Sequence, residues 1–216
     1  RPSTFDLLPT PPMIRPVASC IAVLLLAVSA YGADWTQWRG PAFNGTSEEK
    51  NLPTSFSPTE GIKWKVPLPG PSGATPAISG DNIFVSTPDP EKNLHLFCID
   101  RNTGKIRWQK QLVEGANIDK GKGNMASPSP VADGKAVYVL YGTGDMAALD
   151  YDGNILWQRN FGADYGKFAV MWLYGSSPLL FDGKLYVQVL QRSPAPPDYP
   201  GIGGATGDRD SYLLAL

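Results

Sequence analysis

Cysteine and histidine are scarce in this 216-residue sequence, which contains two cysteines and one histidine. Cys20 lies in a predicted signal segment, so Cys98 is the only cysteine expected in the mature chain. That count excludes an internal disulfide and a zinc–thiolate cluster. A single histidine excludes a metal site built from several histidines. We expect His95, which lies in a strand pattern, to be a packed or surface residue rather than a ligand.

The sequence also lacks an excess of charge of either sign, because it has 19 basic and 20 acidic side chains and a net charge of −1. The absence of a basic patch makes nucleic acid a poor candidate for a partner. No long helical stripe suits a membrane surface. Glycine and proline are abundant, with 23 and 21 residues, and 11% of the chain is aromatic. This composition is typical of a turn-rich β protein.

The N-terminal region has the features of a targeting segment. Residues 1–12 contain four prolines and no periodic pattern, and we interpret them as a non-native upstream segment. Residues 13–33 predict a secretory signal peptide, with Arg15 before an apolar run (17–30) and small residues at the exit. The run is too short for a comfortable membrane span; the alternative is an N-terminal anchor helix. The predicted location is the periplasm or the outside of the cell, with no stable span after cleavage.

An internal repeat is the strongest signal. The pattern Ile-x-Trp ends three segments, at Trp64, Trp108 and Trp157, which are 44 and 49 residues apart. Each copy also carries a small residue before proline, a turn, a β-branched and aromatic strand, and a second apolar strand. The small residue and proline are Thr75-Pro76, Ser129-Pro130 and Ser177-Pro178. A β-rich repeat of this period is typical of a propeller or array.

The repeat therefore predicts an all-β fold, a partial β-propeller of four-stranded antiparallel blades. Residues 34–60 form an N-terminal extension, and residues 61–216 supply about two and a half blades. We expect residues 62–68 to be the outer strand of a blade whose other strands lie beyond position 216. On this interpretation the chain is an N-terminal fragment, and its open sheet edges predict marginal stability or aggregation.

The clearest copy of the repeat runs from Cys98 to Trp108. Asp100 ends a strand and can accept hydrogen bonds from the N–H groups of the turn. Gly104 supplies a positive φ angle. The ring of Trp108 then covers the seam to a neighbouring sheet, and burial of such a ring contributes about 2–3 kcal/mol. We expect the three repeat tryptophans to hold blades together.

This segment resembles the tryptophan-docking motif of pyrroloquinoline-quinone-type (quinoprotein-like) β-propellers, A-x-D-x-x-T-G-x-x-x-W, with Cys98 in place of Ala. The resemblance covers residues 60–216, and the start Asp34 to Pro41 is similar to secreted planctomycete-type bacterial propellers. It implies seven or eight blades in the complete protein. The blade-docking residues that it implies are Trp64, Asp100, Thr103, Gly104, Trp108, Asp150, Gly153 and Trp157. The second copy is looser, since its turn is one residue shorter and lacks Thr.

The resemblance leaves the function open. We favour a binding or scaffolding module with no catalytic residues in this sequence and a protein partner held by propeller loops. The alternative is a dehydrogenase of alcohols or sugars that uses pyrroloquinoline quinone and calcium, with its site mostly in the missing C-terminal part. The vicinal cysteine pair common in such enzymes, and a haem-attachment motif, are absent from this sequence. A third possibility is a sensor domain of a polysaccharide-processing system.

Loops offer few candidates for a ligand. Trp172 and Tyr174 are the best ones, because loops between an outer strand and the next inner strand face the mouth of a propeller channel. Packing of the inner strand is an equally good interpretation of this pair. Asp208 and Asp210, near the glycine-rich stretch 201–207, could bind a cation, although a solvated hairpin loop explains them more simply.

Overall fold

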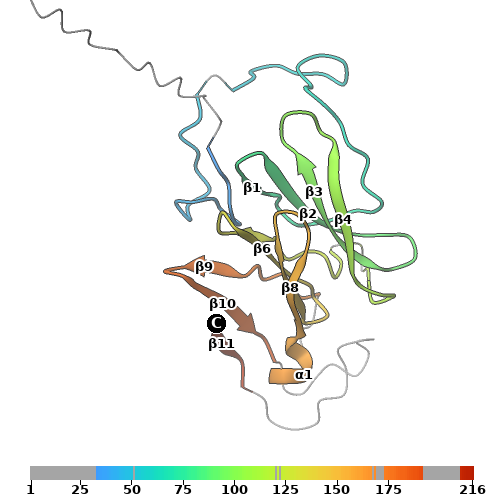
Figure 1. Cartoon of the computed structure of the whole chain (residues 1–216), viewed down its shortest axis with the longest axis vertical. Coiled ribbons are helices and arrows are strands. Elements are labelled where there is room, and N and C mark those ends of the chain that lie inside the picture. The colour runs from blue at the N-terminus through green and yellow to red at the C-terminus, as the bar shows by residue number, and fades with distance from the viewer. Residues whose placement is uncertain are drawn as a thin grey trace, which may run out of the picture. The chain divides into compact units, whose positions relative to one another are not determined.

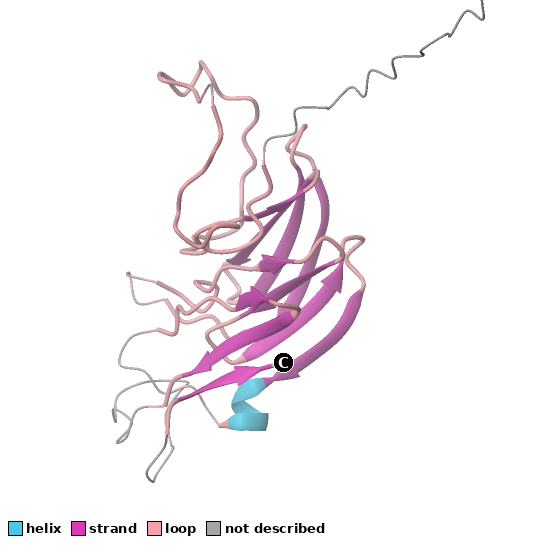
Figure 2. Cartoon of the chain, turned by 90° about the vertical axis from the view of Figure 1, so that its left-hand side faces the viewer, coloured by secondary structure: helices cyan, strands magenta, loops and turns pink. Residues whose placement is uncertain are grey.

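The computed structural model describes residues 33–50, 52–119, 121, 123–166, 168, 173–191 and 210–216. The predicted upstream segment and residues 13–32 of the predicted signal peptide lie outside this set. The described residues belong to one compact unit, Tyr31–Leu216, and form eleven strands and one short helix (Figures 1 and 2). Within these ranges no helix has the length and apolar character needed to cross a membrane.

The first sheet is an antiparallel meander in which each strand pairs with the next one along the chain. Its strands are β1 (Ala77–Ser79), β2 (Asn82–Pro88), β3 (Leu94–Asp100) and β4 (Ile106–Val113). Nearly every residue of β2 and β3 is buried, whereas β4 alternates and is largely exposed. Both faces of the two central strands are therefore covered, and polar residues such as Ser86 and His95 are buried along with the apolar ones.

The second sheet repeats this order. Its strands are β5 (Val131–Ala132), β6 (Ala136–Leu140), β7 (Asp145–Asp150) and β8 (Ile155–Asn160). In both sheets the register between the third and fourth strands shifts at the same repeat position, after Cys98 in the first and after Ala148 in the second. The internal repeat thus extends to the position of a bulge.

The third sheet has the order β11-β10-β9 among the described residues. Its strands are β9 (Leu179–Phe181), β10 (Lys184–Val189) and β11 (Tyr212–Ala215). A single cluster of buried apolar side chains includes Leu96 of β3, Leu149 of β7 and Val187 of β10, so the three sheets share a core. The predicted fold class, an all-β partial propeller of antiparallel sheets, is confirmed.

Residues 62–68 are not in a strand in the structure. The prediction placed the partner strands of this segment beyond position 216, so it stays a prediction. Directly after β8 the chain forms a short helix, α1 (Phe161–Tyr165). Asn160 caps this helix by accepting the Ala163 N–H at 2.8 Å, and the buried ring of Phe161 holds the helix against the core.

Candidate functional site

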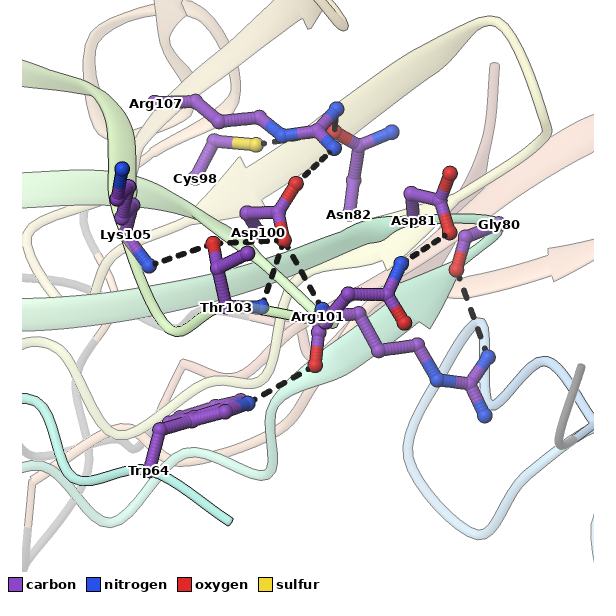
Figure 3. Close-up of polar contacts among 11 residues, drawn as sticks. Trp64, Gly80, Asp81, Asn82, Cys98, Asp100, Arg101, Thr103, Lys105 and Arg107 are labelled. Carbon is purple, nitrogen blue, oxygen red and sulfur yellow. Dashed lines mark hydrogen bonds and ion pairs between the residues drawn. The ribbon is translucent and has the colours of Figure 1, made fainter.

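The turn after β3 is organised by one carboxylate (Figure 3). Asp100 Oδ1 accepts the backbone N–H groups of Asn102 and Thr103, at 3.0 and 2.8 Å, and the Thr103 hydroxyl at 2.9 Å. Asp100 Oδ2 pairs with the guanidinium of Arg107. The bond from Arg107, followed by those from Thr103, holds the pKa of the Asp100 carboxyl well below its usual range. The carboxylate is therefore ionised and fully used in shaping the turn.

The indole of Trp64 lies against this turn. Its Nε1–H donates to the carbonyl oxygen of Arg101 at 2.9 Å (Figure 3). Gly104 has φ +71°, and a Cβ added there would lie 2.7 Å from Cγ of the Trp64 ring. Glycine is required at this position twice over, by its backbone angle and by the close approach of the ring.

The looser second copy forms the same arrangement. Asp150 Oδ1 accepts the N–H groups of Asp152 and Asn154, and the bonds from Asn154 are the largest cause of its lowered pKa. Nε1–H of Trp108 donates to the carbonyl oxygen of Tyr151 at 2.8 Å. Gly153 has φ +86°, and a Cβ there would lie 2.8 Å from Cδ2 of Trp108. A turn shorter by one residue thus accepts the ring of the preceding sheet in the same way.

Trp157 has different surroundings. Its ring packs against Tyr138, with ring centroids 6.2 Å apart. Both side chains line a cleft of about 970 Å³. Leu185 of β10 and Leu216 also line this cleft, which therefore borders both the second and the third sheet. Burial, and then a hydrogen bond to Asp133, raise the pKa of Tyr138 to about 12.

The small residue before each proline links neighbouring sheets. The N–H of Thr75 donates to Oγ of Ser129 at 2.9 Å, and the N–H of Ser129 donates to Oγ of Ser177 at 2.9 Å. In the sequence these residues mark only the start of each copy. A hydroxyl group at the same position of each copy could have indicated a hydrogen bond between neighbouring sheets.

Of the two ligand candidates, Tyr174 packs in the core and Trp172 lies outside the described residues. Tyr174 is 1% exposed, its hydroxyl donates to the carbonyl oxygen of Gln188 at 2.6 Å, and its ring stacks on Phe168 at 4.4 Å. Packing, the second interpretation offered by the sequence, is what the structure shows for Tyr174. Asp208 and the stretch 201–207 also lie outside the described residues, and Asp210 is exposed just before β11.

His95 and Cys98 are both buried. His95 Nδ1 accepts from Gln109 at 3.2 Å, so its Nε2–H donates to Asp89 Oδ2 at 2.7 Å. Burial opposes the ionisation of Asp89, but the bonds from His95 and Asn93 outweigh it and lower its pKa to about 2. Burial raises the pKa of the Cys98 thiol to about 11, so neither thiolate chemistry nor metal binding suits it.

A family model described as outer membrane protein assembly factor BamB matches residues 49–187, more than half of the chain. The chain belongs to this family. The match is consistent with the pyrroloquinoline-quinone-like repeat recognised in the sequence. No curated protein matches the chain.

Three solved structures illustrate what this BamB-family chain is similar to. BamB from Moraxella catarrhalis is 25% identical, with a TM-score of 0.40, over 57% of this chain and 32% of that one. A europium-containing methanol dehydrogenase is 17% identical (TM-score 0.39, 55% and 20% covered). The quinohemoprotein alcohol dehydrogenase from Comamonas testosteroni is 20% identical (0.37, 53% and 16%). The chain thus spans at most about a third of the length of these proteins.

A quinone with calcium would need a group of acidic or amide ligands. Among the side chains that the structure describes, no three His, Cys, Asp or Glu residues gather as a metal site requires. The acidic residues of the repeat turns, Asp100 and Asp150, are already bonded within their own turns. These two carboxylates are therefore engaged in shaping the turns and are not free to bind calcium.

Proposed function

We propose that this protein is an extracytoplasmic β-propeller scaffold that binds a protein of the outer-membrane assembly machinery through its loops. One observation carries the proposal beyond family membership: the chemically distinctive residues of the repeat serve the architecture. Asp100, Asp150 and Gly104 shape turns, and the indoles of Trp64 and Trp108 lie on those turns. The surface available for binding a partner is therefore formed by the loops, which the sheets hold in place. Binding residues in proteins commonly lie on loops that a rigid scaffold positions.

One exposed group of residues, three in a loop and Phe181 at the end of β9, has the composition of a protein-binding surface. Trp38 is 54% exposed, and the guanidinium carbon of Arg39 lies 5.6 Å from the centre of its ring. Phe43 and Phe181 are 41% and 56% exposed and meet edge to face at 6.0 Å. Tryptophan and arginine are enriched among residues that dominate binding energy at interfaces. This group is therefore our first candidate for the contact surface.

The test is photo-crosslinking in cells of the source organism that make the complete gene product. A photoreactive amino acid replaces Trp38, and in a matched variant it replaces Gln111, an exposed residue of the outer strand β4. We expect a crosslinked product from position 38 but not from 111, and its mass spectrum should identify an outer-membrane assembly protein. Equal labelling at both positions, or products from cytoplasmic proteins only, would contradict the scaffold.

The alternative function, a quinone-dependent dehydrogenase, is tested on the purified complete gene product. Pyrroloquinoline quinone and Ca²⁺ are added while tryptophan fluorescence and the reduction of a dye by alcohols or aldoses are recorded. Saturable quinone binding with substrate-dependent dye reduction would replace the scaffold by a dehydrogenase. Under our proposal neither signal exceeds that of a boiled control.

A further inference from the structure

Four consecutive residues, Asp34–Gln37, cross the innermost strands of all three sheets. We call this segment the strap. Trp35 forms two backbone hydrogen bonds with Ile78 of β1, at 2.9 and 2.8 Å. The carbonyl oxygen of Thr36 accepts the N–H of Ala132 in β5 at 2.9 Å. Oε1 of Gln37 accepts the N–H of Leu180 in β9 at 3.2 Å. Three successive residues thus bind three successive sheets.

Both ends of the strap are fixed. At its start, the carboxylate of Asp34 accepts the N–H of Gly80 at 2.9 Å and the hydroxyl of Ser79 at 3.4 Å. At its end, the N–H of Gly40 donates to the carbonyl oxygen of Gln37 at 2.9 Å. Gly40 has φ +73°, and a Cβ there would lie 2.7 Å from the Trp35 ring. The chain therefore folds back tightly and holds the strap in place.

The hydrogen bond of the buried Gln37 side chain is the strap contact whose removal should cost the most stability. The residue is 6% exposed, and a buried amide is retained only where its hydrogen bonds compensate its lost hydration. Its partner, Leu180, lies 143 positions further along the sequence. Loss of this acceptor would leave a peptide N–H on the edge of β9 without the bond that the structure gives it.

The strap adds a connection that stacked repeats lack. In a repeat protein each unit contacts its neighbours, so the first unit influences the third only through the second. The strap bonds to the terminal strands β1, β5 and β9 of the three sheets. Asp34, Thr36 and Gln37 also line the cleft that borders the second and third sheets. Its position lets it set the spacing of the inner strands and the width of that cleft.

We propose that the strap is a clamp that couples the first and third sheets and holds their inner strands in one arrangement. Its contacts act cooperatively, so that loosening one end weakens the other. This role is separate from the scaffold function, since it requires no partner and no ligand. It also gives the N-terminal extension a purpose that no repeat motif indicated.

The test measures amide hydrogen exchange in the full chain at three positions, Gly80, Ala132 and Leu180. Asp34→Ala removes the acceptor at the first end of the strap, and Asp34 is exposed, so folding should tolerate the change. A lost hydrogen bond raises exchange by about fivefold at Gly80. The clamp predicts a rise of at least about threefold at Leu180 as well, at the far end of the strap.

Gln37→Met is the reciprocal variant, since methionine keeps the length of the side chain but removes the acceptor. Exchange should rise at Leu180 and, through the strap, at Ala132. Thr36→Val is the matched control, because Thr36 uses only its backbone carbonyl and should leave all three amides unchanged. A rise confined to Gly80 in Asp34→Ala overturns the clamp, as does a rise confined to Leu180 in Gln37→Met. The Asp34→Ala result decides the question if Gln37→Met does not fold.

Discussion

The contact between Trp108 and Gly153 makes a quantitative prediction about how the sheets are held together. Gly153 has φ +86°, and a Cβ at this position would lie 2.8 Å from Cδ2 of the ring. Gly134, in the same sheet, has φ +92° with nothing within 4 Å of its added Cβ. Alanine at either position meets the same backbone strain, but only Gly153→Ala pushes against the indole.

The two costs can be estimated separately. A left-handed backbone costs an L-residue about 1–2 kcal/mol, and both variants incur it. At Gly153 the ring must also retreat by roughly 0.6 Å to reach an ordinary contact distance, which stretches its 2.8 Å bond to Tyr151. Overpacking of this kind costs about 1–3 kcal/mol. We therefore expect a loss of about 2–5 kcal/mol for Gly153→Ala and about 1–2 kcal/mol for Gly134→Ala.

Urea unfolding followed by tryptophan fluorescence measures both variants. The slope of unfolding free energy against urea should be unchanged, so that a shift in midpoint reports stability. The emission of Gly153→Ala should also change before unfolding, because the Trp108 ring has moved. Equal losses for the two variants, with identical native spectra, would refute the idea that the indole holds the second sheet against the first.

Three further predictions use the same measurement. Ser129→Ala leaves the Thr75 N–H without its acceptor and should cost about 1–3 kcal/mol; a loss below about 0.5 kcal/mol would show that the bond between sheets is dispensable. Trp108→Phe should cost about 1 kcal/mol more than Trp157→Phe, because only the former removes the indole bond to the next turn; equal losses would contradict this. The pKa of Asp89 is lowered from 3.8 to about 2. Between these pH values the folded protein binds fewer protons at Asp89 than the unfolded protein does. The free energy of unfolding should therefore fall as the pH drops from about 4 to about 2. Asn at this position should flatten the decline, and an unchanged pH profile would refute the assignment.

The architecture was predictable because every copy carries the same local chemistry. Paired apolar strands end at Asp100 and Asp150, and a turn follows each one. The copies therefore form the same four-strand order and even shift register at the same position. The prediction of a propeller depends on this repetition, since one such segment alone would not distinguish a blade from a hairpin.

The Ile-x-Trp pattern shows the limit of what the repeat predicts. It was interpreted as the end of a strand, but at Trp108 and Trp157 it begins one, β4 and β8. Trp64 has the same bond from its indole to the next turn, yet its backbone is not in a strand. The pattern thus reports the position of a ring, whereas strand formation depends on a partner that local sequence does not reveal.

The strap could not be predicted from the sequence for a related reason. Its bonds use the backbone of Trp35 and Thr36, which any residue could supply, and a single glutamine amide. Neither periodicity nor a motif distinguishes Gln37 from other glutamines. The contact between the Gln37 side chain and a backbone N–H 143 residues away forms only once the sheets are in place.

The geometry of the repeat explains the residue types in its docking motif as one unit. Cys98 lies directly across from Trp108 in the sheet, and Ala148 lies across from Trp157. Both are fully buried, so a small side chain is needed opposite a large ring. A register shift follows at once and leads into the Asp-centred turn, whose glycine in turn accepts the ring of the preceding sheet. Cysteine can replace alanine in the first copy because size, rather than thiol chemistry, decides this position, which is consistent with the raised pKa of the buried Cys98 thiol.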